Sequence, residues 1–174
     1  CGLDLSMTDD NTSFAMVTEQ DGIIYAKVWG FTPSDRIDEK SMKEKVDYRA
    51  LIRKGECFAC GDEVIDYGFV ERFIIGLPGK YGVEVMQVGY DRYNAISTVQ
   101  KLEQNEIECV EIKQHSSVLH MPTKLVKELI LKKKIRYATN RMLEINFQNA
   151  RCTEDTNKNL YVNKKKSSGK VDMV

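Results

Sequence analysis

The sequence has no long apolar run, and its cysteines do not form a disulfide pattern. No stretch reaches the roughly 18 apolar residues that a membrane-spanning helix needs, and no secretory signal peptide is recognisable. The five cysteines are odd in number and widely spaced along the 174 residues. This usage argues against a disulfide framework and favours a reducing compartment. We therefore expect no membrane partner.

A complete zinc motif is also missing. Cys57 and Cys60 have the spacing of a zinc-binding or redox pair. A structural zinc needs about four ligands, and no second cysteine pair or suitably spaced histidine pair follows. His115 and His120 are far away in the sequence. The sequence therefore disfavours a zinc site at this pair.

The chain has no net charge, but its two halves differ. Residues 1–90 contain 16 acidic and 10 basic residues, whereas residues 91–174 contain 10 acidic and 16 basic residues. The basic excess lies in Lys132–Arg136 and Lys164–Lys166. This division is typical of a metal centre flanked by a surface for a polyanion. A solvated helix end and a polar tail explain either cluster equally well by itself.

The hydrophobic pattern predicts an α/β fold. Strands are predicted first, with Asp21-Gly22 as a hairpin turn, and strands then alternate with helices. This order predicts a mixed sheet with helices on both faces, in which ligands bind at the carboxyl ends of parallel strands. The predicted strands are 1–6, 13–18, 23–31, 57–60, 83–90, 107–112 and 135–137. The predicted helices are 46–54, 66–77, a helix directly after Asp91 with Ile96, Val99 and Leu102 on one face, 122–132 and 140–149, followed by a hairpin at 151–163.

Three aspartates are embedded in apolar sequence, where a carboxylate is locally out of place. Asp4 interrupts the first strand, Asp91 closes a later strand, and Asp172 lies in the last apolar segment. An ionised carboxylate on a core strand is unfavourable unless a basic group or a cation neutralises it. Three such groups together need a cation, because like charges raise each other's pKa. Oxygen ligands favour Mg²⁺ or Mn²⁺, and a pair of such ions can support phosphodiester cleavage.

Each of these aspartates also has an ordinary structural interpretation. Asp4 could end a strand and cap a turn toward Asp9-Asp10-Asn11, and Asp91 could pair with Arg92. Asp172 could be the N-cap of a helix. Spacing alone does not decide between these interpretations and a metal site.

Four short segments follow one another along the chain: Gly2–Ser6, Tyr90–Ala95, Met121–Lys124 and Ser168–Asp172. Taken in this order, they resemble the nuclease domain of the large terminase subunit of tailed bacteriophages, and the likeness covers essentially the whole chain. The resemblance implies a ribonuclease-H-like mixed β-sheet flanked by helices. It also implies a metal-dependent endonuclease that cleaves concatemeric double-stranded viral DNA during genome packaging, in the cytoplasm of the infected host.

The matching motifs place the catalytic, metal-ligating carboxylates at Asp4, Asp91 and Asp172. The resemblance implies two divalent cations, Mg²⁺ or Mn²⁺, with Asp4 bridging both, Asp91 holding one and Asp172 the other. The family continues into a helix after the last aspartate, whereas only Met173 and Val174 follow here. This departure predicts a frayed Asp172 and a weakly held second ion.

Full-length members of the family also carry an N-terminal ATPase motor. No glycine-rich phosphate loop with Lys-Ser/Thr occurs here, and the chain begins at Cys1 rather than Met. We therefore expect residues 1–174 to form a single nuclease domain, cut from a longer protein, that does not hydrolyse ATP. The resemblance implies the portal protein and the small terminase subunit as partners of that longer protein.

Basic side chains are candidates for contacts with the DNA backbone. Such contacts carry no base specificity and weaken steeply with salt. Arg92 could contact a phosphate or pair with Asp91. Two other functions stay open: another ribonuclease-H-like nuclease such as a junction resolvase, and a non-catalytic DNA-binding module. The candidates for DNA binding are Arg92, Lys124, Lys132, Lys133, Lys134, Lys164, Lys165, Lys166 and Lys170.

Overall fold

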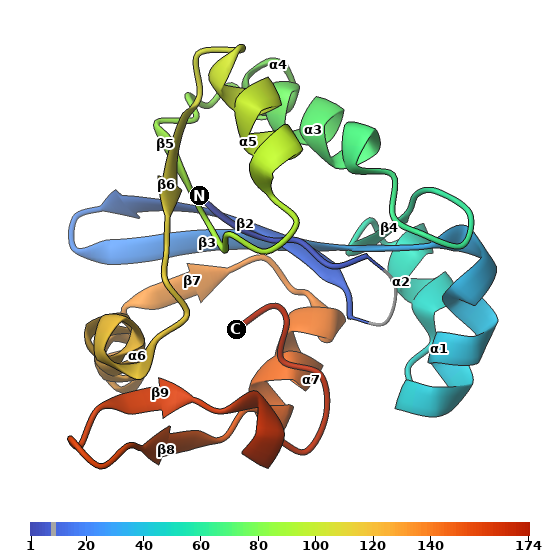
Figure 1. Ribbon diagram of the computed structural model, residues 1–174. Helices are drawn as coiled ribbons and strands as arrows, with labels where there is room; N and C mark the ends of the chain where they lie inside the picture. The colour runs from blue at the N-terminus through green and yellow to red at the C-terminus, as the bar shows by residue number, and fades with distance from the viewer. Residues whose placement is uncertain (8–9) are drawn as a thin grey trace.

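The computed structural model describes residues 1–7 and 10–174, and its centre is a seven-stranded mixed sheet (Figure 1). The strand order is β4-β3-β2-β1-β5-β6, and β7 pairs with β3 as well. Helices lie on both faces of the sheet, so the predicted fold class is confirmed. The strands are β1 (Gly2–Asp4), β2 (Thr12–Gln20), β3 (Ile23–Thr32), β4 (Cys57–Ala59), β5 (Gln87–Tyr90), β6 (Glu108–Glu111) and β7 (Ile135–Tyr137).

Figure 1 shows α3, α4 and α5 above the sheet, and α6, α7 and a separate hairpin of β8 and β9 below it.

Within residues 1–7 and 10–174, no helix combines the length and the apolar character that crossing a bilayer requires. The helices are α1 (Ile37–Glu44), α2 (Tyr48–Arg53), α3 (Tyr67–Ile75), α4 (Leu77–Tyr81), α5 (Ile96–Glu103), α6 (Ser116–Leu131) and α7 (Arg141–Asn149), and the remaining elements are β8 (Cys152–Glu154), β9 (Leu160–Val162) and the 3₁₀ turns η1 (Ser34–Arg36) and η2 (Lys164–Lys166).

The pairing of β1 with β2 and β5 sets where the first carboxylates lie. Asp21 and Gly22 both have positive φ, at 53° and 71°, and such a turn matches the twist of the antiparallel β2 and β3. Strand β1 runs antiparallel to β2 and parallel to β5. Because Leu3 pairs with Tyr90 in register, the carboxyl ends of β1 and β5 lie next to each other.

Two short parallel strands share one edge of β3. Strand β7 pairs with its beginning at Ile24, and β4 pairs with its end from Gly30 onward. Between them, the Asn140 side chain donates a hydrogen bond of 2.8 Å from Nδ2 to the carbonyl oxygen of Val28. The Oδ1 atom of Asn140 accepts from the amide of Leu143 at 2.9 Å and caps α7. One side chain therefore completes the sheet edge and begins the helix.

Two apolar clusters hold the layers together. Above the sheet, Phe14 and Phe31 pack with Val70 and Ile74 of α3, which are fully buried as the helical pattern predicts. Below it and toward α1 and α2, Met142 of α7 belongs to a second cluster. The remaining members of this second cluster are Val28, Ile37, Tyr48, Leu51, Cys57, Leu143 and Met173.

Several predicted helix boundaries are wrong. Leu77-Pro78 begins α4 instead of only ending α3, because proline is tolerated in the first turn of a helix. Helix α5 begins at Ile96, not directly after Asp91, and Ile96 is 66% exposed whereas Val99 and Leu102 are buried.

Helix α6 begins at Ser116, ahead of the predicted start at Pro122, and His115 caps it through Nδ1. Strand β5 is shorter than predicted, since it begins at Gln87. In the predicted turn after the first strand, Thr8 and Asp9 lie outside the described residues.

Candidate metal centre

Asp4 and Asp91 stand at the carboxyl ends of two neighbouring parallel strands. Asp4 is the last residue of β1, and Asp91 follows β5 directly. The Oδ1 atom of Asp91 accepts a hydrogen bond from the amide of Tyr93 at 3.3 Å, which fixes the turn toward α5. Among the described residues, no ion pair joins Asp91 to Arg92. The structural pairing considered for these two residues is therefore not found.

Asp172 is firmly held beside Asp4. Its side chain is only 2% exposed, and its Oδ2 atom accepts a hydrogen bond from the amide of Asn11 at 3.2 Å. Ser13, which pairs with Asp4 across β1 and β2, donates its hydroxyl to the backbone carbonyl of Asp172. The next amide, that of Met173, donates to Oδ1 of Asn146 at 3.3 Å. The expectation that Asp172 is frayed is therefore wrong.

A lysine ammonium group lies among these carboxylates. The Nζ atom of Lys164 is 3.1 Å from Oδ1 of Asp172, 3.8 Å from Oδ2 of Asp4 and 3.8 Å from Oδ2 of Asp10. Lys170 pairs with Asp10 as well. In the part of the chain that the structure describes, Asp91 forms no ion pair with Lys164. The structure therefore gathers Asp4, Asp10 and Asp172 around one positive charge, and Asp91 stands beside them.

Asp10 is the acidic residue that sequence reasoning missed. It lies in an acidic, polar turn, where a carboxylate is ordinary. The signal that could have found it is the antiparallel return of β2, because the Ser13–Asp4 pair brings the residues just before β2 back toward the end of β1. Lys164 was predicted as a DNA contact, and its interaction with distant acids left no mark in the local sequence.

The electrostatics of the cluster follow from partial burial and close charges. Burial raises the pKa of Asp4 to about 6; the negative charges of Asp172, Asp91 and Asp10 add to this rise, and Lys164 opposes it. Although burial acts to raise the pKa of Asp10, its hydrogen bond with Lys170 and the charge of Lys164 lower it. Burial opposes the charge of Lys164, yet Asp172 and Asp4 raise its pKa above the ordinary value. The charged form is therefore disfavoured at Asp4 and favoured at Asp10.

The donor chemistry of this cluster fits a hard divalent cation, but its spacing fits an ammonium group. All the nearby donors are oxygens, the ligand type that Mg²⁺ prefers at about 2.0–2.1 Å. The Lys164 distances are longer, and within residues 1–7 and 10–174 no three acidic, cysteine or histidine side chains converge closely enough to hold a metal. The buried Oδ1 atom of Asn11 has no hydrogen-bond partner among the described residues, so a further oxygen is available nearby.

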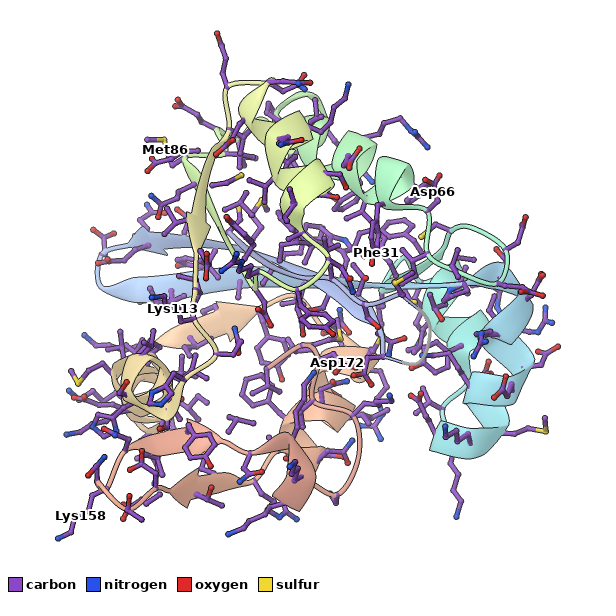
Figure 2. The ribbon with its side chains drawn as sticks, viewed as in Figure 1. Phe31, Asp66, Met86, Lys113, Lys158 and Asp172 are labelled. Carbon is purple, nitrogen blue, oxygen red and sulfur yellow. The ribbon has the colours of Figure 1, made fainter. Side chains whose placement is uncertain are left out.

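A buried hydrogen-bond chain supports this side of the cluster. The Nδ2 atom of Asn11 donates to the Tyr48 hydroxyl at 2.7 Å, and that hydroxyl donates to Oε2 of Glu44 at 2.6 Å. Lys40 completes the chain with an ion pair of 3.7 Å to Glu44. Figure 2 shows Asp172 below the sheet at the centre of the molecule, on the same side as α7 and the β8–β9 hairpin.

The predicted DNA contacts occupy different places. Lys165 and Lys166 are exposed on η2, and Arg92 is exposed after β5. Lys164 and Lys170 instead face the carboxylates. The other candidates lie on α6 or directly after it and are exposed, and they are Lys124, Lys132, Lys133 and Lys134.

The model of the family described as "Terminase large subunit, endonuclease domain" matches residues 1–174. The chain belongs to this family. The resemblance of the four segments to this family is therefore confirmed.

Individual members of this terminase family show the same fold at low sequence identity. The large terminase subunit of Enterobacteria phage HK97 is 22% identical over 174 residues, which are 98% of this chain and 34% of that protein. The crystal structure of the HK97 large terminase superposes with a TM-score of 0.89 at 22% identity, covering 99% of this chain and 36% of that one. The chain thus spans about a third of the length of these HK97 relatives.

A second solved member is the large terminase nuclease of thermophilic phage G20c, in a crystal structure with bound magnesium. It superposes with a TM-score of 0.60 at 13% identity, and the alignment covers 98% of this chain and 73% of that one.

Proposed function

We propose that this chain is an endonuclease that hydrolyses phosphodiester bonds of double-stranded viral DNA during genome packaging, using divalent cations. The observation that carries the proposal is the meeting of Asp4 and Asp172 around one positive charge, with Asp91 beside Asp4 at the end of β5. Membership of a terminase endonuclease family and a magnesium-bound relative support it. The portal protein and the small terminase subunit are the partners that we propose for a longer protein containing this chain.

In this proposal Asp4 would hold two cations, Mg²⁺ or Mn²⁺, and Asp91 and Asp172 would each hold one of them. When bound, such ions activate a water molecule and stabilise the leaving oxygen of the phosphodiester. The chain itself holds these carboxylates in fixed positions. Hydrogen bonds from Ser13 and Asn11 fix Asp172, and the backbone pairing of β1 with β2 and β5 fixes Asp4.

The lysines would supply the binding surface. Lys165, Lys166 and the exposed lysines at the end of α6 can contact backbone phosphates without reading bases. Arg92 is exposed next to Asp91 and would contact a phosphate near the cleavage point. A surface of this kind suits an enzyme that must cut many sequences.

The test is a plasmid-cleavage assay with Mn²⁺ or Mg²⁺ and with EDTA. We expect Asp4→Asn to lower cleavage at least about 100-fold, because it removes charge where the cations bind, while the circular dichroism spectrum stays unchanged. Glu19→Gln is the matched control, since Glu19 is an exposed carboxylate toward the other end of β2.

Equal cleavage by the Asp4→Asn and Glu19→Gln proteins would overturn the proposal. A gel-shift measurement on the same samples separates the alternatives, because a non-catalytic DNA-binding module shifts the plasmid without cutting it. A junction resolvase would prefer a four-way junction over linear duplex.

A further inference from the structure

Lys164 interacts with carboxylates from three separate parts of the chain. Asp4 belongs to β1, Asp10 precedes β2, and Asp172 lies in the last turn. All three have an oxygen within 3.8 Å of the Lys164 Nζ atom. The ammonium group of Lys164 thus stands where these acidic groups meet, and Lys170 also pairs with Asp10.

The local fold sets the position of Lys164. The amide of Asn163, directly after β9, donates to the carbonyl of Arg151 at 2.8 Å. The Oδ1 atom of Asn163 accepts from the amides of Lys165 at 3.0 Å and Lys166 at 3.3 Å, which caps η2. The backbone of Lys164 is therefore fixed at the end of the β8–β9 hairpin, within reach of the acids.

The two sides of this contact differ in their freedom to move. The Lys164 side chain is 56% exposed, whereas that of Asp172 is 2% exposed and hydrogen-bonded to Asn11. A long, half-exposed lysine can turn into solvent without uncovering the core. The buried carboxylate cannot withdraw without breaking its hydrogen bonds. If one partner leaves, it is the lysine.

We propose that the ammonium group of Lys164 takes the place of a divalent cation in the metal-free protein and leaves the carboxylates when the cation binds. This inference rests on the proposed function, because it requires these carboxylates to bind metal. Lysine and metal then compete for the same oxygens, and whichever binds more tightly shifts the population of the other. The present spacing, wider than Mg²⁺ needs, is the spacing expected while the ammonium group occupies the cluster.

The first test is a Mn²⁺ titration without DNA, followed by electron paramagnetic resonance and by calorimetry. We expect Lys164→Met to bind Mn²⁺ about twofold to fivefold more tightly than the wild type, the size expected for a partly exposed charge pair. Lys164→Arg, which keeps the charge, should bind close to the wild-type affinity. Lys165→Met is the matched control, because Lys165 is a neighbouring lysine on the same 3₁₀ turn and is exposed.

A second measurement separates competition from a merely structural role. In EDTA, Lys164→Met should lower the melting temperature, since the acids then lack their counter-charge. In saturating Mn²⁺ this difference should disappear or reverse. An equal loss in both conditions would overturn the inference.

The two proposals fail in different ways. Wild-type and Lys164→Met proteins that bind Mn²⁺ with the same affinity would overturn the role of Lys164 and leave the proposed function standing. If neither protein binds Mn²⁺, the proposed function fails and the competition fails with it.

Discussion

The region above the sheet and the layer formed by α6 and the β8–β9 hairpin differ in how much apolar surface they bury. In α3, Val70 and Ile74 are fully buried. In α6, all sixteen residues are described and none is buried; Leu125 is 55% and Leu131 is 75% exposed. Local opening requires less free energy where few apolar contacts are lost. Asp4 is part of the sheet, and Asp172 is hydrogen-bonded to Asn11 and Ser13 at the start of β2, whereas Lys164 follows the thinly packed hairpin.

This difference suits a centre in which the anions stay fixed and the cation changes. Asp4 and Asp172 are held by the sheet and by buried hydrogen bonds. Lys164 follows the two-stranded β8–β9 hairpin. Each residue of these two strands is either half-buried or exposed. We expect the two regions to differ as strongly in energy as they do in burial.

The largest effect is expected from truncation in the packed region. Ile74→Ala should lower the free energy of unfolding by about 2–5 kcal/mol, because it leaves a cavity between α3 and the sheet. Leu131→Ala at the exposed end of α6 should change it by no more than about 0.5 kcal/mol. Urea denaturation of both variants measures the comparison. Similar losses in the two proteins would show that the regions are equally packed.

A smaller effect is expected in the second apolar cluster, where Tyr48 supports the acids. Tyr48→Phe should cost about 1–3 kcal/mol, because it leaves the buried Nδ2 group of Asn11 without its acceptor. Tyr25→Phe on β3 is the control, since Tyr25 is 43% exposed. Thermal denaturation of both variants gives the difference. A neutral Tyr48→Phe would mean that the hydrogen-bond chain from Asn11 to Glu44 contributes little.

The smallest effect on the folded protein is expected in the lysine layer. Changing Lys165 and Lys166 together to Ala should leave stability within about 0.5 kcal/mol. It should reduce the slope of log affinity for DNA against log salt by about 2, because two phosphate contacts are lost. Lys101→Ala on α5 should leave the slope unchanged. Filter binding at several salt concentrations measures it, and an unaltered slope in the double variant would remove η2 from the DNA surface.

Much of the fold follows from local sequence. The Asp21-Gly22 turn and the Asn140 cap of α7 were predictable because each depends on residues next to it in the chain. The start of α6 was not, since Pro122 favours the first turn of a helix and here lies inside one. Ile96 was expected on the same apolar helix face as Val99 and Leu102, but it is the first residue of α5 and its side chain is exposed.

The candidate site was predictable where an acid interrupts an apolar pattern. Asp4 and Asp172 stood out for this reason, and the structure brings both of them to Lys164. The assignment of Asp4, Asp91 and Asp172 as metal ligands stays a prediction. Asp10 was missed, although the antiparallel return of β2 brings the start of that strand back toward Asp4. The pairing of Lys164 could not be found, because it depends on how the β8–β9 hairpin is placed in space and not on neighbouring residues.

The edge of β3 that β4 and β7 share is connected to the acidic cluster through α7. Asn140 fills the space between β4 and β7 and sets the first turn of α7. The same helix carries Asn146, whose Oδ1 atom accepts the amide that follows Asp172. Asn140, which lies between the two strands that pair with β3, thus positions the helix that holds the residue after Asp172. Asn140→Ala would displace an acid that it never touches.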